Sequence, residues 1–236
     1  MGHLPWGLAD EQGATAMDEA TRALLDLWDT TEEAVDGLAA ADWGRPLGRT
    51  DRARACAALD TGGGDGADVA DLVTHLGGGH PADPRRMREA LAVAHARADR
   101  QLTRSAPSGD DLAAQCLDMC LHTHDLLAAL DRDLDPDEAG PAALKACRLV
   151  VGTLPRLLAC TPHPRASCLR VVVRAGEGAA VIDRSFPTTG SGAAETLEAE
   201  AVALVLLLAG RRDADELRDL VAWDGPTAEQ VLAAAR

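Results

Sequence analysis

The chain has 236 residues, of which 47% are hydrophobic and 2% aromatic, and its formal net charge is −15. Lys145 is its only lysine. Because affinity for phosphate backbones and anionic lipids comes mainly from basic side chains, this balance argues against nucleic-acid binding and against a membrane surface.

The N-terminus and the cysteines favour a cytoplasmic protein. The sequence MGHLPWGLADEQ has neither a basic nor an apolar signal region, so no secretory signal is visible. The longest apolar run, residues 201–210, is far shorter than the ~20 residues that span a bilayer. The six cysteines include no CxxC pair, so we expect free thiols.

Apolar periodicity predicts five helices, at residues 17–40, 68–76, 85–105, 110–130 and 141–159. Asp68 is the expected N-cap of the second helix, and Gly77 begins the glycine run that ends it. Asp110 or Asp111 is expected to cap the fourth helix. The short loops predict an antiparallel helical bundle over residues 1–160.

Residues 44–65 are rich in glycine and arginine and could include a short helix at 50–59. The glycine loop at 62–66 lacks the Lys-Ser/Thr of a phosphate-binding loop, so we assign it no nucleotide role.

The pattern changes after residue 160. Residues 169–174 (LRVVVR) are β-branched and could pair with residues 178–183 across a turn. An apolar helix is expected at 193–210, followed by two short segments at 213–221 and 226–236. Residues 161–236 therefore predict a small α+β domain, and the whole chain a two-domain α+β protein.

Asp118, His122 and Asp125 are spaced at i, i+4 and i+7, on one face of the fourth helix. A carboxylate and an imidazole one turn apart can close on one divalent ion. The alternative is an ordinary i, i+4 pair worth ~0.5 kcal/mol. Asp125 could orient the imidazole from its far nitrogen or ligate the ion directly.

His75, near the end of the second helix, is the expected third ligand, pointing toward the bundle interior. Two His and one carboxylate leave open positions, which is typical of catalytic metal sites. The alternative is a core histidine with one hydrogen bond, or a surface histidine at a helix C-terminus.

Cys116, Cys120 and His124 lie on roughly the opposite face and would suit zinc. We favour core packing for this set, because cysteine is among the most buried residue types. The remaining histidines lack a partner at ligand spacing and are expected to be surface or structural: His3, His80, His95 and His163.

Arg211 and Arg212 follow the apolar helix. They could complement the helix dipole or clamp an anion over the pocket.

Three stretches resemble the mycothiol-dependent maleylpyruvate isomerase family, within the DinB-like superfamily of metal-binding four-helix bundles. They are LLDLWDTTEEAVDGLAAADW (24–43), DVADLVTHL (68–76) and CLDMCLHTHDLLAALD (116–131). The resemblance places the family's metal ligands on His75, Asp118 and His122. AVALVLLLAGRR (201–212) is similar to the family's second, sterol-carrier-like α+β domain.

This resemblance implies a divalent metal, usually Zn²⁺, that activates the thiol of mycothiol for S-transfer or cis–trans isomerisation of a small electrophile, in detoxification or secondary metabolism. The resemblance also implies an arginine of the second domain that holds an anionic group of the substrate, for which Arg211 or Arg212 is the candidate. From the sequence itself, Asp125 is a further candidate catalytic residue, and we expect a monomer or homodimer.

One stretch departs from the family, whose Cys-Pro-Gly-Trp-Thr turn precedes the first ligand. Residues 64–68 read Gly-Asp-Gly-Ala-Asp instead. Two alternatives therefore stand beside the thiol-dependent enzyme. One is a thiol-independent metalloenzyme that carries out a rearrangement or hydrolysis, and the other is a non-catalytic binding protein.

Overall fold

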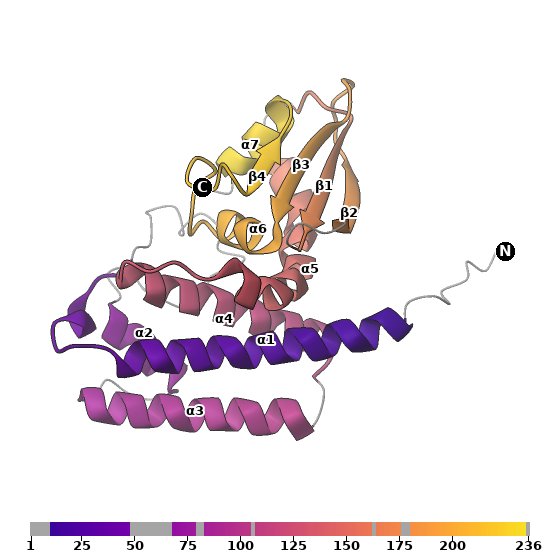
Figure 1. Cartoon of the computed structure of the whole chain (residues 1–236). Coiled ribbons are helices and arrows are strands. Elements are labelled where there is room, and N and C mark those ends of the chain that lie inside the picture. Colours follow the sequence, from indigo (N-terminus) through magenta and orange to yellow (C-terminus); the bar gives the residue numbers. More distant parts are fainter. Residues whose placement is uncertain are drawn as a thin grey trace.

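The computed structural model describes residues 10–47, 68–78, 83–104, 107–161, 164–175 and 180–234. Over these ranges the chain is α+β and mostly helical, with a four-stranded sheet near the C-terminus (Figure 1). The elements in chain order are α1 (Asp10–Asp36), the 3-10 helix η1 (Asp42–Gly44), α2 (Val69–Leu76), α3 (Pro84–Arg104), α4 (Gly109–Ala129), α5 (Pro136–Cys160), β1 (Cys168–Arg174), β2 (Ala180–Pro187), β3 (Glu195–Glu200), α6 (Ala201–Leu208), β4 (Val221–Trp223) and α7 (Pro226–Ala234).

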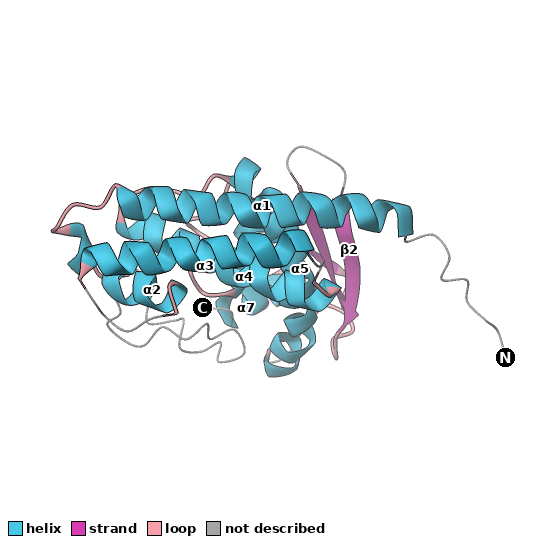
Figure 2. Ribbon diagram, turned by 90° about the horizontal axis from the view of Figure 1, so that it is seen from below, coloured by secondary structure: helices cyan, strands magenta, loops and turns pink. Residues whose placement is uncertain are grey.

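The helical part is built around α4, which contacts α1, α2, α5 and α6. Helix α3 lies alongside α1 on the outer side of the bundle (Figure 2). Fully buried leucines dominate the core, as the scarcity of aromatic residues predicts: Leu24, Leu91, Leu112, Leu121 and Leu154. Helix α4 is buried on almost every side between Leu112 and Leu127, so a polar side chain there must find a partner or a function.

Helix α2 forms as the sequence predicts. Asp68 caps it: its carboxylate accepts from the Asp71 N–H, while the Asp71 carboxylate accepts from the Asp68 N–H. Val69, Leu72 and Val73 form its buried stripe, and Gly77 follows its last residue.

The sheet has the strand order β2-β1-β3-β4. The predicted hairpin is present, with β2 antiparallel to β1 and Val172 opposite Asp183. Strand β3 pairs parallel to β1, and β4 pairs antiparallel to β3. Four residues of β1 are buried (Leu169, Val171, Val172 and Val173), and helices α6 and α7 pack against the sheet (Figure 1).

The predicted helix over 193–210 is wrong over residues 193–200. Residues 195–200 form β3, in which buried and half-buried residues alternate, and α6 begins only at Ala201. Six residues of this composition can adopt either state, and pairing with β1 decides for the strand. Strand β4 (Val221–Trp223) was likewise not predicted from the sequence.

Two predicted helix starts also differ. Ser108, not Asp110 or Asp111, caps α4, because its hydroxyl accepts from the Asp111 N–H. Helix α5 begins at Pro136 with Asp135 as its cap, five residues before the expected start. The expected helix at 50–59 and glycine loop at 62–66 lie outside the described residues.

Within the described ranges, the helices are all too short or too polar to cross a bilayer.

Candidate metal centre

Helices α2 and α4 run antiparallel, and this brings His75 beside His122. The start of α2 is held by a hydrogen bond from the Val69 N–H to the Arg45 carbonyl (3.1 Å). The Arg45 side chain, in turn, donates to a carbonyl of the last turn of α4, so the start of α2 and the end of α4 lie together. From these anchors His75 lies about 9 Å along α2 and His122 about 10 Å back along α4, so the two side chains meet.

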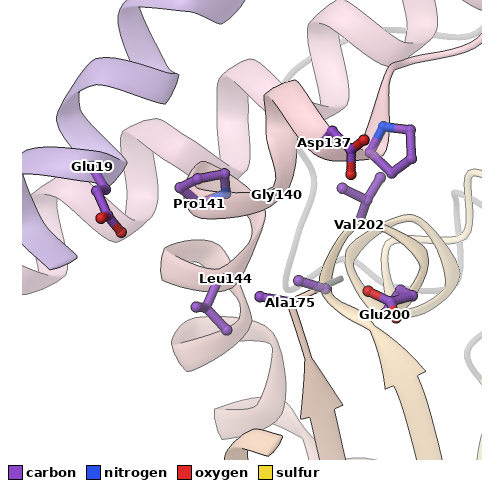
Figure 3. A pocket seen from close by; sticks show the side chains of 10 residues that line it. Glu19, Asp137, Gly140, Pro141, Leu144, Ala175, Glu200 and Val202 are labelled. Atoms are coloured by element: carbon purple, nitrogen blue, oxygen red, sulfur yellow. The ribbon is translucent and has the colours of Figure 1, made fainter. Parts of the chain in front are cut away.

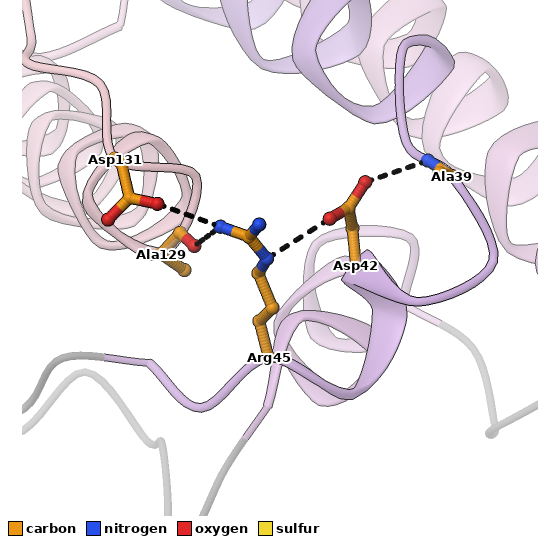
Figure 4. A network of polar contacts seen from close by, with 5 residues as sticks. All are labelled: Ala39, Asp42, Arg45, Ala129 and Asp131. Carbon is orange, nitrogen blue, oxygen red and sulfur yellow. Dashed lines mark hydrogen bonds and ion pairs between the residues drawn. The ribbon is translucent and has the colours of Figure 1, made fainter.

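Arg45 thus links the start of α2 to the end of α4 (Figure 4). Its Nη1 donates to the Ala129 carbonyl (3.0 Å) and contacts the Asp131 carboxylate (3.1 Å). Its Nε lies 3.0 Å from Asp42, whose second oxygen accepts from the Ala39 N–H. No local sequence pattern points to this role, because its partners lie at least 84 residues away or in a turn.

His122 is an imidazole buried in the helical part of the protein. Its side chain is only 1% exposed, and neither Nδ1 nor Nε2 has a hydrogen-bond partner among the described residues. Nε2 lies 3.2 Å from Oδ1 of Asp118, but off the direction that a hydrogen bond requires. The His75 ring lies edge-on to the His122 ring, with centroids 5.0 Å apart. Buried polar atoms without partners are rare and call for an explanation.

The distance from His122 Nε2 to Asp118 Oδ1 and the separation of the His75 and His122 rings both fit ligands of one metal ion. Two donor atoms about 2.0–2.1 Å from a zinc ion at a tetrahedral angle lie about 3.3 Å apart. Two imidazoles that share such an ion have ring centroids about 5 Å apart. The chemistry of the set, two imidazoles and one carboxylate, also suits a divalent ion with open positions.

His75 differs from expectation, because its side chain is exposed rather than directed into the bundle. It lies in the last turn of α2, beyond the buried stripe. Among the described side chains, no three His, Cys, Asp or Glu residues are already placed to hold one metal ion. His75 would have to turn a nitrogen toward His122 to complete the set, and its exposure leaves it room to do so.

Asp125 and Arg211, both expected near the chemistry, bind each other. Arg211 Nε lies 2.9 and 3.1 Å from the two oxygens of Asp125, and both side chains are buried. Arg211 Nη1 also donates to the Ala209 carbonyl. This pair joins the C-terminal part to α4 one turn from His122, which favours a structural role for both residues.

Arg212 makes a different contact. Its Nη2 donates to Asp133 at 2.6 Å, and the Asp133 side chain is 85% exposed. Within the described ranges, the guanidinium is therefore held by a solvated carboxylate.

The thiols of α4 lie in the core. Cys116 and Cys120 are buried, and burial raises the pKa of Cys116 to about 12 and that of Cys120 well above its usual value. Thiolate ligands are therefore disfavoured there. His124, the third member of this set, is buried and lines a cavity, and burial lowers its pKa.

His95 is structural. Its ring stacks on Trp28 with centroids 5.8 Å apart, and its Nδ1 lies 2.7 Å from Glu32. It thereby ties α3 to α1. His3, His80 and His163 lie outside the described residues.

A cavity of about 280 Å³ lies beside Glu19 of α1 and the starts of α5 and α6 (Figure 3). Glu19, Asp137 and Glu200 surround it, together with apolar side chains that include Leu144 and Val202. None of the candidate metal ligands lines it.

Comparison of the chain with known protein families, curated proteins and solved structures found no match.

Proposed function

We propose that the protein is a metal-dependent enzyme that uses a low-molecular-weight thiol, such as mycothiol, for S-transfer to a small electrophile or for its cis–trans isomerisation. One observation carries this proposal. The His122 imidazole is buried, beside Asp118 and within reach of His75, and no described residue forms a hydrogen bond with either of its nitrogens.

In this proposal His122, Asp118 and His75 hold a divalent ion, with Zn²⁺ the expected one. Such an ion lowers the pKa of a bound thiol and so supplies thiolate at neutral pH. His122 is the inner anchor, because its burial fixes the ring. Asp118 is 44% exposed and His75 lies on the surface, so the open positions face solvent, from which thiol and substrate can enter.

Asp125 and Arg211 act on this site through α4. Their buried ion pair lies one turn below His122 and restrains the helix that carries it. In this proposal they are positioning residues rather than groups that touch the substrate.

Metal content tests the proposal. We expect the purified protein to bind about one equivalent of Zn²⁺ and His122→Ala to bind almost none. His95→Ala is the matched control, because it removes an imidazole that already has its partners in Trp28 and Glu32. If wild type and His122→Ala hold the same near-zero metal, both enzyme interpretations fail and a non-catalytic binding protein remains.

The thiol is tested separately, with the metal-loaded protein, mycothiol and a panel of small electrophiles. Turnover that needs both metal and mycothiol supports the proposal. Turnover without thiol would instead favour a metalloenzyme for rearrangement or hydrolysis. The substituted residues 64–68 motivate that alternative; of them the structure describes Asp68, which keeps its capping role.

A further inference from the structure

A second cavity, of about 290 Å³, lies where α4, α6 and the segment 212–220 meet. Its walls are mainly aliphatic, formed by Leu134, Val202, Ala203, Leu206, Leu217 and Leu220. Leu220 is one of the few large apolar side chains exposed in the described part of the chain. The cavity is therefore an apolar pocket that reaches the surface, near the lower end of the size range of small-molecule sites, about 300–1,000 Å³.

Two groups in this pocket can bind a polar ligand atom. His124 is 4% exposed and lines the pocket. The Arg212 guanidinium, 29% exposed, is the only cationic arginine or lysine group among the lining residues.

The acidic groups of the lining are already occupied. Asp133 contacts Arg212, and Glu216 accepts from the Asp213 N–H at 2.9 Å. Because the Asp133 carboxylate is largely in water, its pair with Arg212 is weak and easily exchanged. Asp133 thus occupies the position that a carboxylate entering the pocket would take.

This pocket is distinct from the candidate metal centre. Residues 122 and 124 are separated by about 200° around a helix. His122 meets His75 of α2, whereas His124 faces residues of α6 and of the segment 212–220. A ligand in the pocket would therefore lie on a different face of α4 from the proposed metal ion.

We propose that this pocket binds a small amphipathic carboxylate. The carboxylate replaces Asp133 on Arg212, the apolar body packs against the leucine walls, and His124 offers a hydrogen bond to the buried end of the ligand. The site is a second ligand site, independent of the proposed metal chemistry.

The test measures binding by calorimetry to the full chain in the presence of EDTA, so that its result does not depend on the metal proposal. The probes are 3-phenylpropionate and its charge-inverted analogue 3-phenylpropylammonium. Wild type should bind the carboxylate and not the ammonium ion. Arg212→Gln should weaken carboxylate binding about ten- to hundredfold. Arg218→Gln is the matched control, because this exposed arginine also pairs with an aspartate but does not line the pocket.

The variant Asp133→Asn tests whether the pocket prefers an anionic or a cationic ligand. It should tighten binding of 3-phenylpropionate about two- to fivefold, because the competing carboxylate is removed. Stronger binding of the ammonium probe, equal loss in Arg212→Gln and Arg218→Gln, or no binding of either probe would each overturn the proposal. Circular dichroism of each variant confirms that the fold is intact.

Discussion

At the residue scale, burial separates side chains that look alike in the sequence. His122 and His95 are both imidazoles on bundle helices. His95 has Trp28 and Glu32 as partners, whereas His122 is more deeply buried and has no hydrogen bond within the described ranges. Of these two histidines, His122 is therefore the one with coordinating capacity left for an ion.

The buried thiols lead to a prediction about pH. Burial raises the pKa of Cys147 from its ordinary value of 9.0 to about 12. Above pH 9 the unfolded chain releases this proton first, so the folded state loses stability as pH rises toward 12. The expected loss for one such thiol is about 1.4 kcal/mol per pH unit.

Urea unfolding of wild type and Cys147→Ala between pH 8 and pH 11 measures this effect. The free energy of unfolding should fall less steeply with pH in the variant. Identical slopes would mean that the thiol is not protected from ionisation in the folded state.

At the element scale, Arg45 sets the alignment of α2 with α4. Its carbonyl holds the start of α2, and its side chain holds the end of α4 and Asp131 (Figure 4). Asp131 has a positive φ of 57°, an uncommon conformation for a residue with a side chain. The Arg45 contact therefore supports a turn that is strained by itself.

Replacing Arg45 by Gln should lower the free energy of unfolding by about 1–2 kcal/mol, because a carbonyl and two carboxylates lose their guanidinium partner. It should also weaken Zn²⁺ binding, since His75 and His122 lie on the helices that Arg45 aligns. Chemical unfolding and a zinc titration measure the two effects.

Arg85→Gln serves as the control for Arg45→Gln. Arg85 pairs with Glu89 on the exposed surface of its own helix, far from Arg45 in the sequence. If both variants retain wild-type zinc affinity, the alignment role of Arg45 is wrong.

At the scale of the whole molecule, two neighbouring arginines join the C-terminal part to α4 and the loop after it. Arg211 does so through a buried pair with Asp125, and Arg212 through an exposed contact with Asp133. The chain thus contains its own comparison between a desolvated and a solvated ion pair.

Arg211→Met should cost about 3–5 kcal/mol of folding free energy, because it takes two guanidinium contacts from a buried carboxylate. Arg212→Met should cost less than about 1 kcal/mol. Thermal and urea unfolding compare the two variants. The double variant Arg211→Met/Asp125→Leu should recover most of the loss, since it removes the buried charge as well. Similar losses for the two single variants would show that burial does not distinguish the pairs.

The sequence by itself determined the helical part of the fold. Local signals are strong there: apolar spacing in α1, α3 and α4, the Asp68 cap and the terminating Gly77 of α2. Helical hydrogen bonds join residues four apart, so such signals are complete within one segment. The spacing of Asp118 and His122 likewise follows from one helix.

Only the tertiary structure decided the rest. Residues 195–200 become a strand because β1 lies beside them, although their own composition permits a helix. Contacts between residues far apart in the chain decide three further features. They are the exposure of His75, the link that Arg45 makes between α2 and α4, and the pairing of Asp125 with Arg211. Burial and partner choice arise when separate elements pack together, and no single segment of sequence contains that information.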